Sequence, residues 1–395
     1  MRSCQINLVI YVCACYTFKL RYLVKKIKIA TVFSGIGAPE QALVRMDKNF
    51  EIEFACDNGE RLIDIDYNKE FGVVKSLDTV QEKQQYAEHL YANNTKKHNF
   101  VKDSYLANYK INNDLFFEDV KLLDGSDFNN KVDLFVGGSP CQSFSIAGAR
   151  GGFEDTRGTL FYEYARLVKE ICPKVFVYEN VYGVLTHDKG QTWQTMQNVF
   201  NDLGYYFKWA ILDARDYGIP QGRRRLFVVG FKDKEAYERF SFPKKKELNV
   251  NMQDFLEENA AIGSIQSVND VLTCINKEKG EPEERYYLSP KLLKYCLSPG
   301  TKNFYHVDAQ IDLKIARAIL STIGNSHRSS VNNYVTTNGR VRALTIREAH
   351  RLMGFPDSYR IVVSKAQAYK QAGNSIVVDV LIALFKSIYT AMEWE

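Results

Sequence analysis

The sequence predicts an α/β protein with a mostly parallel central sheet and a second, smaller domain. From Lys28 onward, short apolar runs alternate with stretches whose apolar residues recur at helical spacing, which is the pattern of βα units. The apolar runs are continuous, as expected of strands covered by helices on both faces. The chain of 395 residues also exceeds one typical domain, so a large and a smaller lobe are expected.

Five apolar runs are predicted to form the strands of the sheet. They span residues 28–33, 51–56, 132–138, 174–180 and 224–231. Helices are predicted over 40–46, after the glycine turn SGIGAPE, and over 81–94 and 160–171. Residues 60–117 are polar and rich in Lys, Asn and Tyr, so we expect an insertion on the periphery of the sheet.

The βα alternation stops in the second half of the chain. Residues 28–235 are therefore expected to form the larger domain and 236–342 the smaller one. Residues 343–395 are expected to form a hinge and a C-terminal helix that returns to the larger domain. In this segment a helix over 344–356 is predicted to end at Gly354, and a glycine turn in QAGNS is predicted to precede a long apolar helix ending near 392.

The composition is that of an ordinary globular protein, with 45% hydrophobic and 25% charged residues. The net charge of +5 is compatible with a polyanionic partner. The eight cysteines form no C-x-x-C pair, so we expect no metal site and a reducing, cytoplasmic location. The apolar stretch 6–18 is too short to span a membrane, so residues 1–27 are interpreted as an extension without an assigned role, with a signal peptide as the alternative.

The turn after the first strand is typical of a nucleotide-binding site. Gly35 and Gly37 allow the backbone to approach a ligand closely, whereas Glu40 stands where a dinucleotide fingerprint has a third glycine and would repel a pyrophosphate. Asp57, after the second strand, suits a ribose diol, and Asp119 can accept a hydrogen bond from an adenine amino group. A nucleoside cofactor without phosphates fits best, and we expect S-adenosylmethionine.

Three peptides at predicted strand ends carry the groups for one specific reaction. SPCQSFS contributes the thiol of Cys141, ENV the carboxyl group of Glu179, and QGRRR the guanidinium groups of Arg223 and Arg225. Carbon 5 of cytosine becomes nucleophilic when a thiolate adds to carbon 6, and a protonated carboxyl group at ring N3 relieves the resulting charge. That carboxyl group needs a pKa raised by burial, and nearby guanidinium groups favour the thiolate.

The same peptides resemble the motifs of the DNA (cytosine-5) methyltransferase family, of the bacterial or phage restriction-modification type. FSGIGAPE, GGSPCQSFSIAG with GFEDTRGTLF, YENV, QGRRRLFVVG, LTIREAHRLMGFPDSY and QAGNSIVV follow one another in the order of that family. The resemblance covers about residues 28–60, 115–232 and 340–385. It implies a Rossmann-like S-adenosylmethionine-dependent methyltransferase fold, with residues 236–342 as a target-recognition domain.

By matching position, the resemblance assigns roles to individual residues. Cys141 is expected to be the nucleophile, Glu179 to engage N3 and the amine of a flipped cytosine, and Arg225, with Arg223, to bind O2. The loop residues Gln142, Ser145 and Arg157 are expected to contact DNA. The expected cofactor contacts are Phe33, Ser34, Gly35, Ile36, Gly37, Asp57, Asn58, Asp119, Val120, Pro140, Leu160, Asn374 and Ser375. Asn58 departs from the large residue that often stacks on the adenine in relatives.

Double-stranded DNA is the substrate that this resemblance implies. The target base must be rotated out of the duplex, and the smaller domain is expected to read base edges in the major groove. We expect a monomer, no membrane association, and a cognate restriction endonuclease as a functional partner. A tRNA cytosine-5 methyltransferase and a non-catalytic DNA-binding regulator are the alternatives, and a nicotinamide-dependent oxidoreductase is disfavoured by Glu40.

Overall fold

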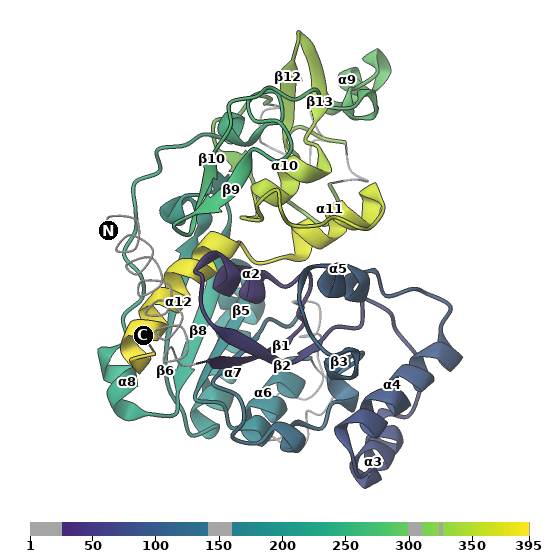
Figure 1. The fold of residues 1–395 in the computed structure, drawn as a ribbon, viewed down its shortest axis with the longest axis vertical. Helices are drawn as coiled ribbons and strands as arrows, with labels where there is room; N and C mark the ends of the chain where they lie inside the picture. The colour runs from purple at the N-terminus through teal and green to yellow at the C-terminus, as the bar shows by residue number, and fades with distance from the viewer. Residues whose placement is uncertain (1–25, 141–159, 299–309, 324–326, 395) are drawn as a thin grey trace, which may run out of the picture.

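The computed structural model describes residues 26–140, 160–298, 310–323 and 327–394. At its centre lies a seven-stranded sheet with the strand order β3-β2-β1-β4-β5-β8-β6 (Figure 1). The strands are β1 (Ile27–Val32), β2 (Phe50–Cys56), β3 (Phe116–Phe117), β4 (Leu134–Gly137), β5 (Val175–Val181), β6 (Tyr206–Asp213) and β8 (Arg224–Phe231). All five predicted strands are confirmed, because β1, β2, β4, β5 and β8 overlap them closely.

The sheet is parallel except at β8, which runs antiparallel to both of its neighbours, β5 and β6. The predicted mostly parallel sheet is therefore confirmed. Starting from β1 at the middle of the sheet, the strands β2 and β3 follow toward one edge. The strands β4, β5, β8 and β6 follow toward the other edge. The strand order thus reverses between β1 and β4, and in such sheets ligands bind at the carboxyl ends of the strands that flank this point.

Helices cover both faces of the sheet. Alternate side chains of β1 and β4 enter two separate hydrophobic clusters, with Ile29 and Val136 in one and Ala30 and Phe135 in the other. The first cluster is covered by α2 (Ala38–Arg45) and α12 (Val378–Met392), and the second by α6 (Leu160–Ile171) and α7 (Gln191–Asp202). The helix predicted over 160–171 has the bounds of α6.

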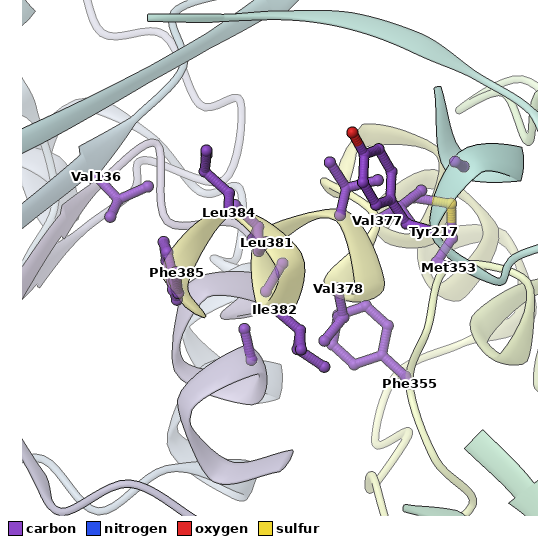
Figure 2. Close-up of a cluster of buried hydrophobic side chains, with 14 of the residues drawn as sticks. Val136, Tyr217, Met353, Phe355, Val377, Val378, Leu381, Ile382, Leu384 and Phe385 are labelled. Carbon is purple, nitrogen blue, oxygen red and sulfur yellow. The ribbon is translucent and has the colours of Figure 1, made fainter. Parts of the chain in front are cut away.

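The C-terminal helix α12 returns to the sheet, as predicted. Figure 2 shows Leu381, Leu384 and Phe385 of this helix directed toward the region of Val136 in β4. Within the described residues, the stretch Lys365–Met392 is long and apolar enough to cross a membrane, but 61% of its most apolar window is buried inside the fold. That burial is what a core helix of a globular domain requires.

The segment 60–117 contributes three helices and the edge strand of the sheet. These helices are α3 (Tyr67–Ser76), α4 (Val80–Asn94) and α5 (Phe100–Asn108), and β3 pairs in parallel with β2. The helices α3 and α4 lie at the periphery, as predicted, and project from the edge of the sheet in Figure 1. The predicted peripheral position is wrong for the end of α5, where Tyr105 and the following Tyr109 are buried in the hydrophobic cluster beneath α2.

The smaller lobe is built from short elements. It contains α9 (Pro290–Leu297), the hairpin of β9 (Ile265–Val268) with β10 (Val271–Cys274), and the hairpin of β12 (Tyr334–Thr337) with β13 (Arg340–Ala343). A further strand, β11 (Ala316–Arg317), pairs in parallel with β7 (Gln221–Gly222) and so joins this lobe to the larger one. The domain boundary expected between residues 235 and 236 falls inside the helix α8 (Lys234–Arg239). Phe240, directly after this helix, still packs on Phe231 of β8 in the larger lobe. The chain therefore enters the smaller lobe later than predicted.

The hinge contains α10 (Ile346–Arg351) and α11 (Lys365–Asn374). The helix predicted to end at Gly354 ends at Arg351, and the chain then turns at Gly354, whose φ of 87° favours glycine. The glycine turn predicted in QAGNS is wrong, because Gly373 lies inside α11. A Cβ at Gly373 would lie 2.1 Å from Ser321 N, so this glycine permits close approach of the smaller lobe and makes no turn.

Candidate active site

The turn after β1 is shaped by left-handed backbone and by hydrogen bonds to β2. Gly35 and Gly37 have φ values of 53° and 76°, and Gly37 caps α2. Ser34 Oγ lies 3.0 Å from the backbone nitrogen of Cys56 and ties the two strand ends together. A Cβ at Gly37 would lie 2.1 Å from the ring of Tyr109, so only glycine fits there. The buried Ile36 also lies in this turn and accepts a hydrogen bond from Tyr359 through its carbonyl.

A cavity opens where the strand order reverses. It is lined by residues 31–35 at the end of β1, 136–138 at the end of β4, Glu179 of β5, and 374–376 between α11 and α12. Among the predicted cofactor contacts, Phe33, Ser34, Gly35, Asn374 and Ser375 therefore come together. Asn374 Nδ2 donates to Glu60 Oε1 at 2.7 Å, so the turn after β2 reaches the hinge beside this cavity.

Asp57 and Asp119 lie on neighbouring strand ends. Asp57 follows β2 and accepts hydrogen bonds from the backbone nitrogens of Gly35 (2.9 Å) and Gly59 (2.8 Å). Burial raises the pKa of Asp57 above its ordinary value, while these backbone donors oppose the rise. The backbone nitrogen of Asp57 donates to Phe117 O, which brings the end of β3 and the nearby Asp119 close to this carboxylate.

Two tyrosines of the segment 60–117 orient Asp119. Tyr91 Oη donates to Asp119 Oδ2 at 2.7 Å, and Tyr67 Oη donates to the same oxygen at 3.2 Å. Asp119 Oδ1 accepts from the backbone nitrogen of Lys121 at 3.0 Å. Sequence analysis missed this pair of tyrosines, because no spacing in a polar helical segment indicates that a side chain reaches a carboxylate just after β3.

The remaining predicted cofactor residues lie around this region without lining the cavity. Asn58 is engaged in its own turn, where its amide donates to Arg61 O at 3.0 Å. Val120 is buried directly after Asp119, and Leu160 is the first residue of α6. Pro140 is exposed at the end of the segment that follows β4.

Glu40 does not face the cavity, which corrects the reason for disfavouring a dinucleotide. Its Oε1 accepts hydrogen bonds from Thr31 Oγ1 (2.9 Å) and Tyr105 Oη (2.7 Å), and the side chain is fully buried behind the glycine turn. Its Oε2 is buried and has no hydrogen-bond partner among the residues that the structure describes. Burial raises the pKa of Glu40 to about 7. Direct repulsion of a pyrophosphate by Glu40 is therefore not supported by its position.

The predicted nucleophile Cys141 and the predicted DNA contacts Gln142, Ser145 and Arg157 lie outside the described residues. The described residues directly before Cys141 contact β5. A Cβ at Gly138 would lie 2.9 Å from Glu179 Oε2, so this glycine lets the end of β4 approach the carboxyl group. Asn180 Nδ2 donates to Ser139 O at 3.2 Å and to Tyr178 Oη at 2.7 Å.

Glu179 and Arg225 form an ion pair at the carboxyl end of β5. Glu179 Oε1 lies 3.0 Å from Arg225 Nε, and the two residues stand on antiparallel neighbouring strands. Burial raises the pKa of Glu179 above its ordinary value, although the guanidinium groups of Arg225 and Arg223 oppose the rise. A carboxyl group in this state can hold a proton close to neutral pH more readily than an exposed glutamate.

Arg223 occupies a different environment from Arg225. Its guanidinium group is buried and donates to three backbone carbonyls, those of Ile319 (2.7 Å), Gly373 (2.9 Å) and Ser375 (2.8 Å). Burial lowers the pKa of Arg223 to about 9. These bonds direct Arg223 away from the base-binding role that it was expected to share with Arg225. From this position Arg223 holds the smaller lobe and the hinge against the strand that carries Arg225.

Comparisons with known proteins agree with this geometry. The family model for C-5 cytosine-specific DNA methylases matches residues 81–390. The type II methyltransferase M.HhaI of Haemophilus parahaemolyticus is 35% identical over 263 residues, which cover 67% of this chain and 77% of that protein. The type II methyltransferase M.HpaII of Haemophilus parainfluenzae is 37% identical over 297 residues, which cover 72% and 79%.

Solved structures share the fold at lower identity. The Dnmt2 methyltransferase of S. pombe superposes with a TM-score of 0.61 at 16% identity, covering 93% of this chain and 99% of that one. The family model, which matches residues 81–390, covers the part of the 60–117 segment from α4 onward. It also covers the Glu179–Arg225 pair and the hinge. The chain belongs to the C-5 cytosine-specific DNA methylase family.

Proposed function

We propose that the protein transfers a methyl group from S-adenosylmethionine to carbon 5 of a cytosine in a short sequence of duplex DNA. The observation that carries this proposal is the Glu179–Arg225 pair at the cavity where the strand order reverses. A carboxyl group with a raised pKa beside a guanidinium group suits the N3, amine and O2 edge of one pyrimidine. Family membership supports the choice of cytosine and of carbon 5.

In the proposed mechanism, Cys141 adds as a thiolate to carbon 6 of the extruded cytosine. The electron pair of the carbon 5–carbon 6 double bond moves toward the ring carbonyl and N3, and Glu179 donates its proton at N3 as this charge develops. Arg225 binds O2 and holds the ring plane. After carbon 5 has gained its methyl group, loss of the carbon 5 proton to a base expels Cys141 and restores the double bond, while Glu179 recovers its proton from N3.

The residues around the cavity fit the methyl donor by their chemistry. Asp57 would accept from a ribose diol and Asp119 from an adenine amino group, while the turn at residues 33–37 gives backbone access to the ligand. Both carboxylates keep lone pairs beyond the hydrogen bonds described above. When bound there, S-adenosylmethionine supplies an electrophilic methyl group on a sulfonium ion.

Duplex DNA is the proposed substrate and the smaller lobe the proposed reader of its sequence. The relatives named above are type II methyltransferases, and the matching family model is of DNA methylases, which does not favour the tRNA alternative. A non-catalytic regulator would need neither the Glu179–Arg225 pair nor Cys141. We further propose a cytoplasmic monomer that works alongside a cognate restriction endonuclease, and that Gln142, Ser145 and Arg157 contact the DNA.

The test is methyl transfer with purified protein and radiolabelled S-adenosylmethionine, offered plasmid DNA or total tRNA. We expect label in DNA, and a covalent protein–DNA adduct when cytosine is replaced by 5-fluorocytosine, because the fluorine at carbon 5 cannot leave as a proton does. The Cys141→Ser variant should bind the methyl donor and form no adduct. Label in tRNA alone, or turnover by Cys141→Ser close to wild type, would contradict the proposal.

A further inference from the structure

Arg224 lies at the end of the sheet where the cavity opens. It is the first residue of β8 and directly precedes Arg225, the partner of Glu179. Because β8 runs antiparallel to β5, it begins where β5 ends. Successive side chains of a strand point to opposite faces, so Arg224 projects away from the Glu179–Arg225 pair and toward Tyr182, the residue after β5. Arg224 is exposed to solvent, whereas Arg223 is buried and Arg225 half-buried.

The ring of Tyr182 holds the guanidinium group of Arg224 in place. The guanidinium carbon lies 4.6 Å from the centroid of this ring, and Tyr182 is itself 39% exposed, so the stacked pair stands at the surface. Stacking covers one face of the planar group and leaves the N–H donors at its edges free. Tyr182 therefore orients Arg224 without occupying the donors that bind an anion.

The carboxylates beside Arg224 are engaged by other arginines. Asp213, which stands opposite Arg224 on β6, pairs with Arg215 at 2.6 Å, and Glu179 pairs with Arg225 at 3.0 Å. Within the described residues, the guanidinium group of Arg224 makes no ion pair and donates no hydrogen bond. Its charge is therefore available to an anion that arrives from solvent.

The start of β8 carries an excess of positive charge. Of the three arginines at 223–225, only Arg225 is paired with a carboxylate in the part of the chain that the structure describes. A surface with unpaired positive charge beside a binding cavity attracts a polyanion and raises its local concentration. The charge at this strand end thus complements a nucleic acid strand.

We infer that Arg224, stacked on Tyr182, binds a phosphodiester group of the DNA strand whose cytosine is held by Glu179 and Arg225. The inference rests on the proposed function and adds a binding residue to it. A flipped base stays attached to its backbone, so phosphates of the same strand lie beside the opening of the pocket. A phosphate offers two oxygens to the free edge of a guanidinium group. Such a contact adds affinity and positions the strand without reading its sequence.

The first test replaces Arg224 by methionine, which keeps most of the side-chain length and removes the charge and the donors. Binding of a fluorescein-labelled DNA duplex is measured by anisotropy at several salt concentrations, with S-adenosylhomocysteine present. We expect the slope of log K against log salt to fall in magnitude by about one, with affinity about tenfold weaker near 0.1 M salt.

The matched control is Arg239→Met. Arg239 is exposed in α8, which follows the opposite end of β8, and it lies 3.9 Å from Glu235. This substitution removes the same charge far from the cavity, so its salt slope should match that of the wild type. An equal loss of slope in Arg224→Met and Arg239→Met would overturn the inference, because net charge alone would then explain the effect.

A second variant, Tyr182→Leu, tests the role of the stack. It keeps the charge of Arg224 and removes the ring that orients it. We expect an unchanged salt slope and an affinity about threefold weaker, because the guanidinium group must then be ordered on binding. An affinity equal to that of the wild type would contradict the orienting role of Tyr182.

Stability separates a ligand contact from a structural role. Since Arg224 is exposed and has no described hydrogen bond from its side chain, the melting temperature of Arg224→Met should equal that of the wild type. A lower melting temperature with an unchanged salt slope would overturn the inference, and so would methylation at altered sequences, which would indicate a base contact. If the wild type itself neither binds nor methylates DNA, the proposed function fails; if it does both and Arg224→Met matches it, only the inference on Arg224 fails.

Discussion

The buried carboxyl group of Glu40 should make the stability of the protein fall as pH rises toward neutrality. Burial raises its pKa from 4.5 to about 7, although hydrogen bonds from Tyr105, from its own backbone and from Thr31 oppose the rise. Between these two values the folded protein keeps the proton while the unfolded chain has released it, so rising pH favours unfolding. The full effect corresponds to about 3 kcal/mol, of which about 2.5 kcal/mol develops between pH 5 and pH 8.

The substitution Glu40→Gln removes this titration and keeps the shape of the side chain. The free energy of unfolding is measured by urea denaturation of both proteins from pH 5 to pH 8, and their difference is followed, since other titrating groups contribute equally to both. We expect the wild type to lose about 2.5 kcal/mol relative to Glu40→Gln across this range. Glu51→Gln, an exposed carboxyl group on β2, serves as the control. A difference that does not change with pH would refute the assignment of Glu40 as a carboxyl group protonated below neutrality.

Three further predictions concern the site. Glu179→Gln should lower kcat by at least about a hundredfold while cofactor binding, measured by calorimetry, stays unchanged, because only the proton at N3 is lost; a kcat near wild type would contradict this role. Tyr91→Phe removes a hydrogen bond to Asp119 that contributes about 1 kcal/mol. The KM for S-adenosylmethionine should therefore rise about fivefold while kcat stays constant. An unchanged KM would show that Asp119 is not oriented for the cofactor. Gly373→Ala places a Cβ 2.1 Å from the backbone nitrogen of Ser321. This clash should lower the free energy of unfolding, measured by urea denaturation, by about 1–3 kcal/mol. A stability equal to that of the wild type would mean that the two lobes can separate there freely.

The elements that the sequence predicts well are those whose pattern has one physical cause. The strands β4, β5 and β8 are covered on both faces, so their apolar runs are continuous, and α6 buries one regular stripe. The edge strand β6 was not predicted, because its first six residues are exposed or half-buried without regular alternation, among them the exposed Trp209, and only its last two residues are buried. Only two residues form β3, which is too short to give a periodic signal.

The site was predictable where a residue type at a strand end carries the chemistry, as for Glu179 and Arg225. It was not predictable where the partner is a backbone group or comes from a distant segment. Arg223 has the same sequence context as Arg225, and only the fold brings Ile319, Gly373 and Ser375 around it. Likewise, the approach of Tyr91 to Asp119 depends on how α4 packs beside β3.

The most direct test of the central claim is bisulfite sequencing of plasmid DNA from cells that lack other cytosine methyltransferases and express this chain. The account predicts that one cytosine within one short sequence is protected from conversion, and that Cys141→Ser abolishes the protection. It is contradicted if cytosines in every context are converted although the protein is folded and binds S-adenosylmethionine, or if protection persists in Cys141→Ser.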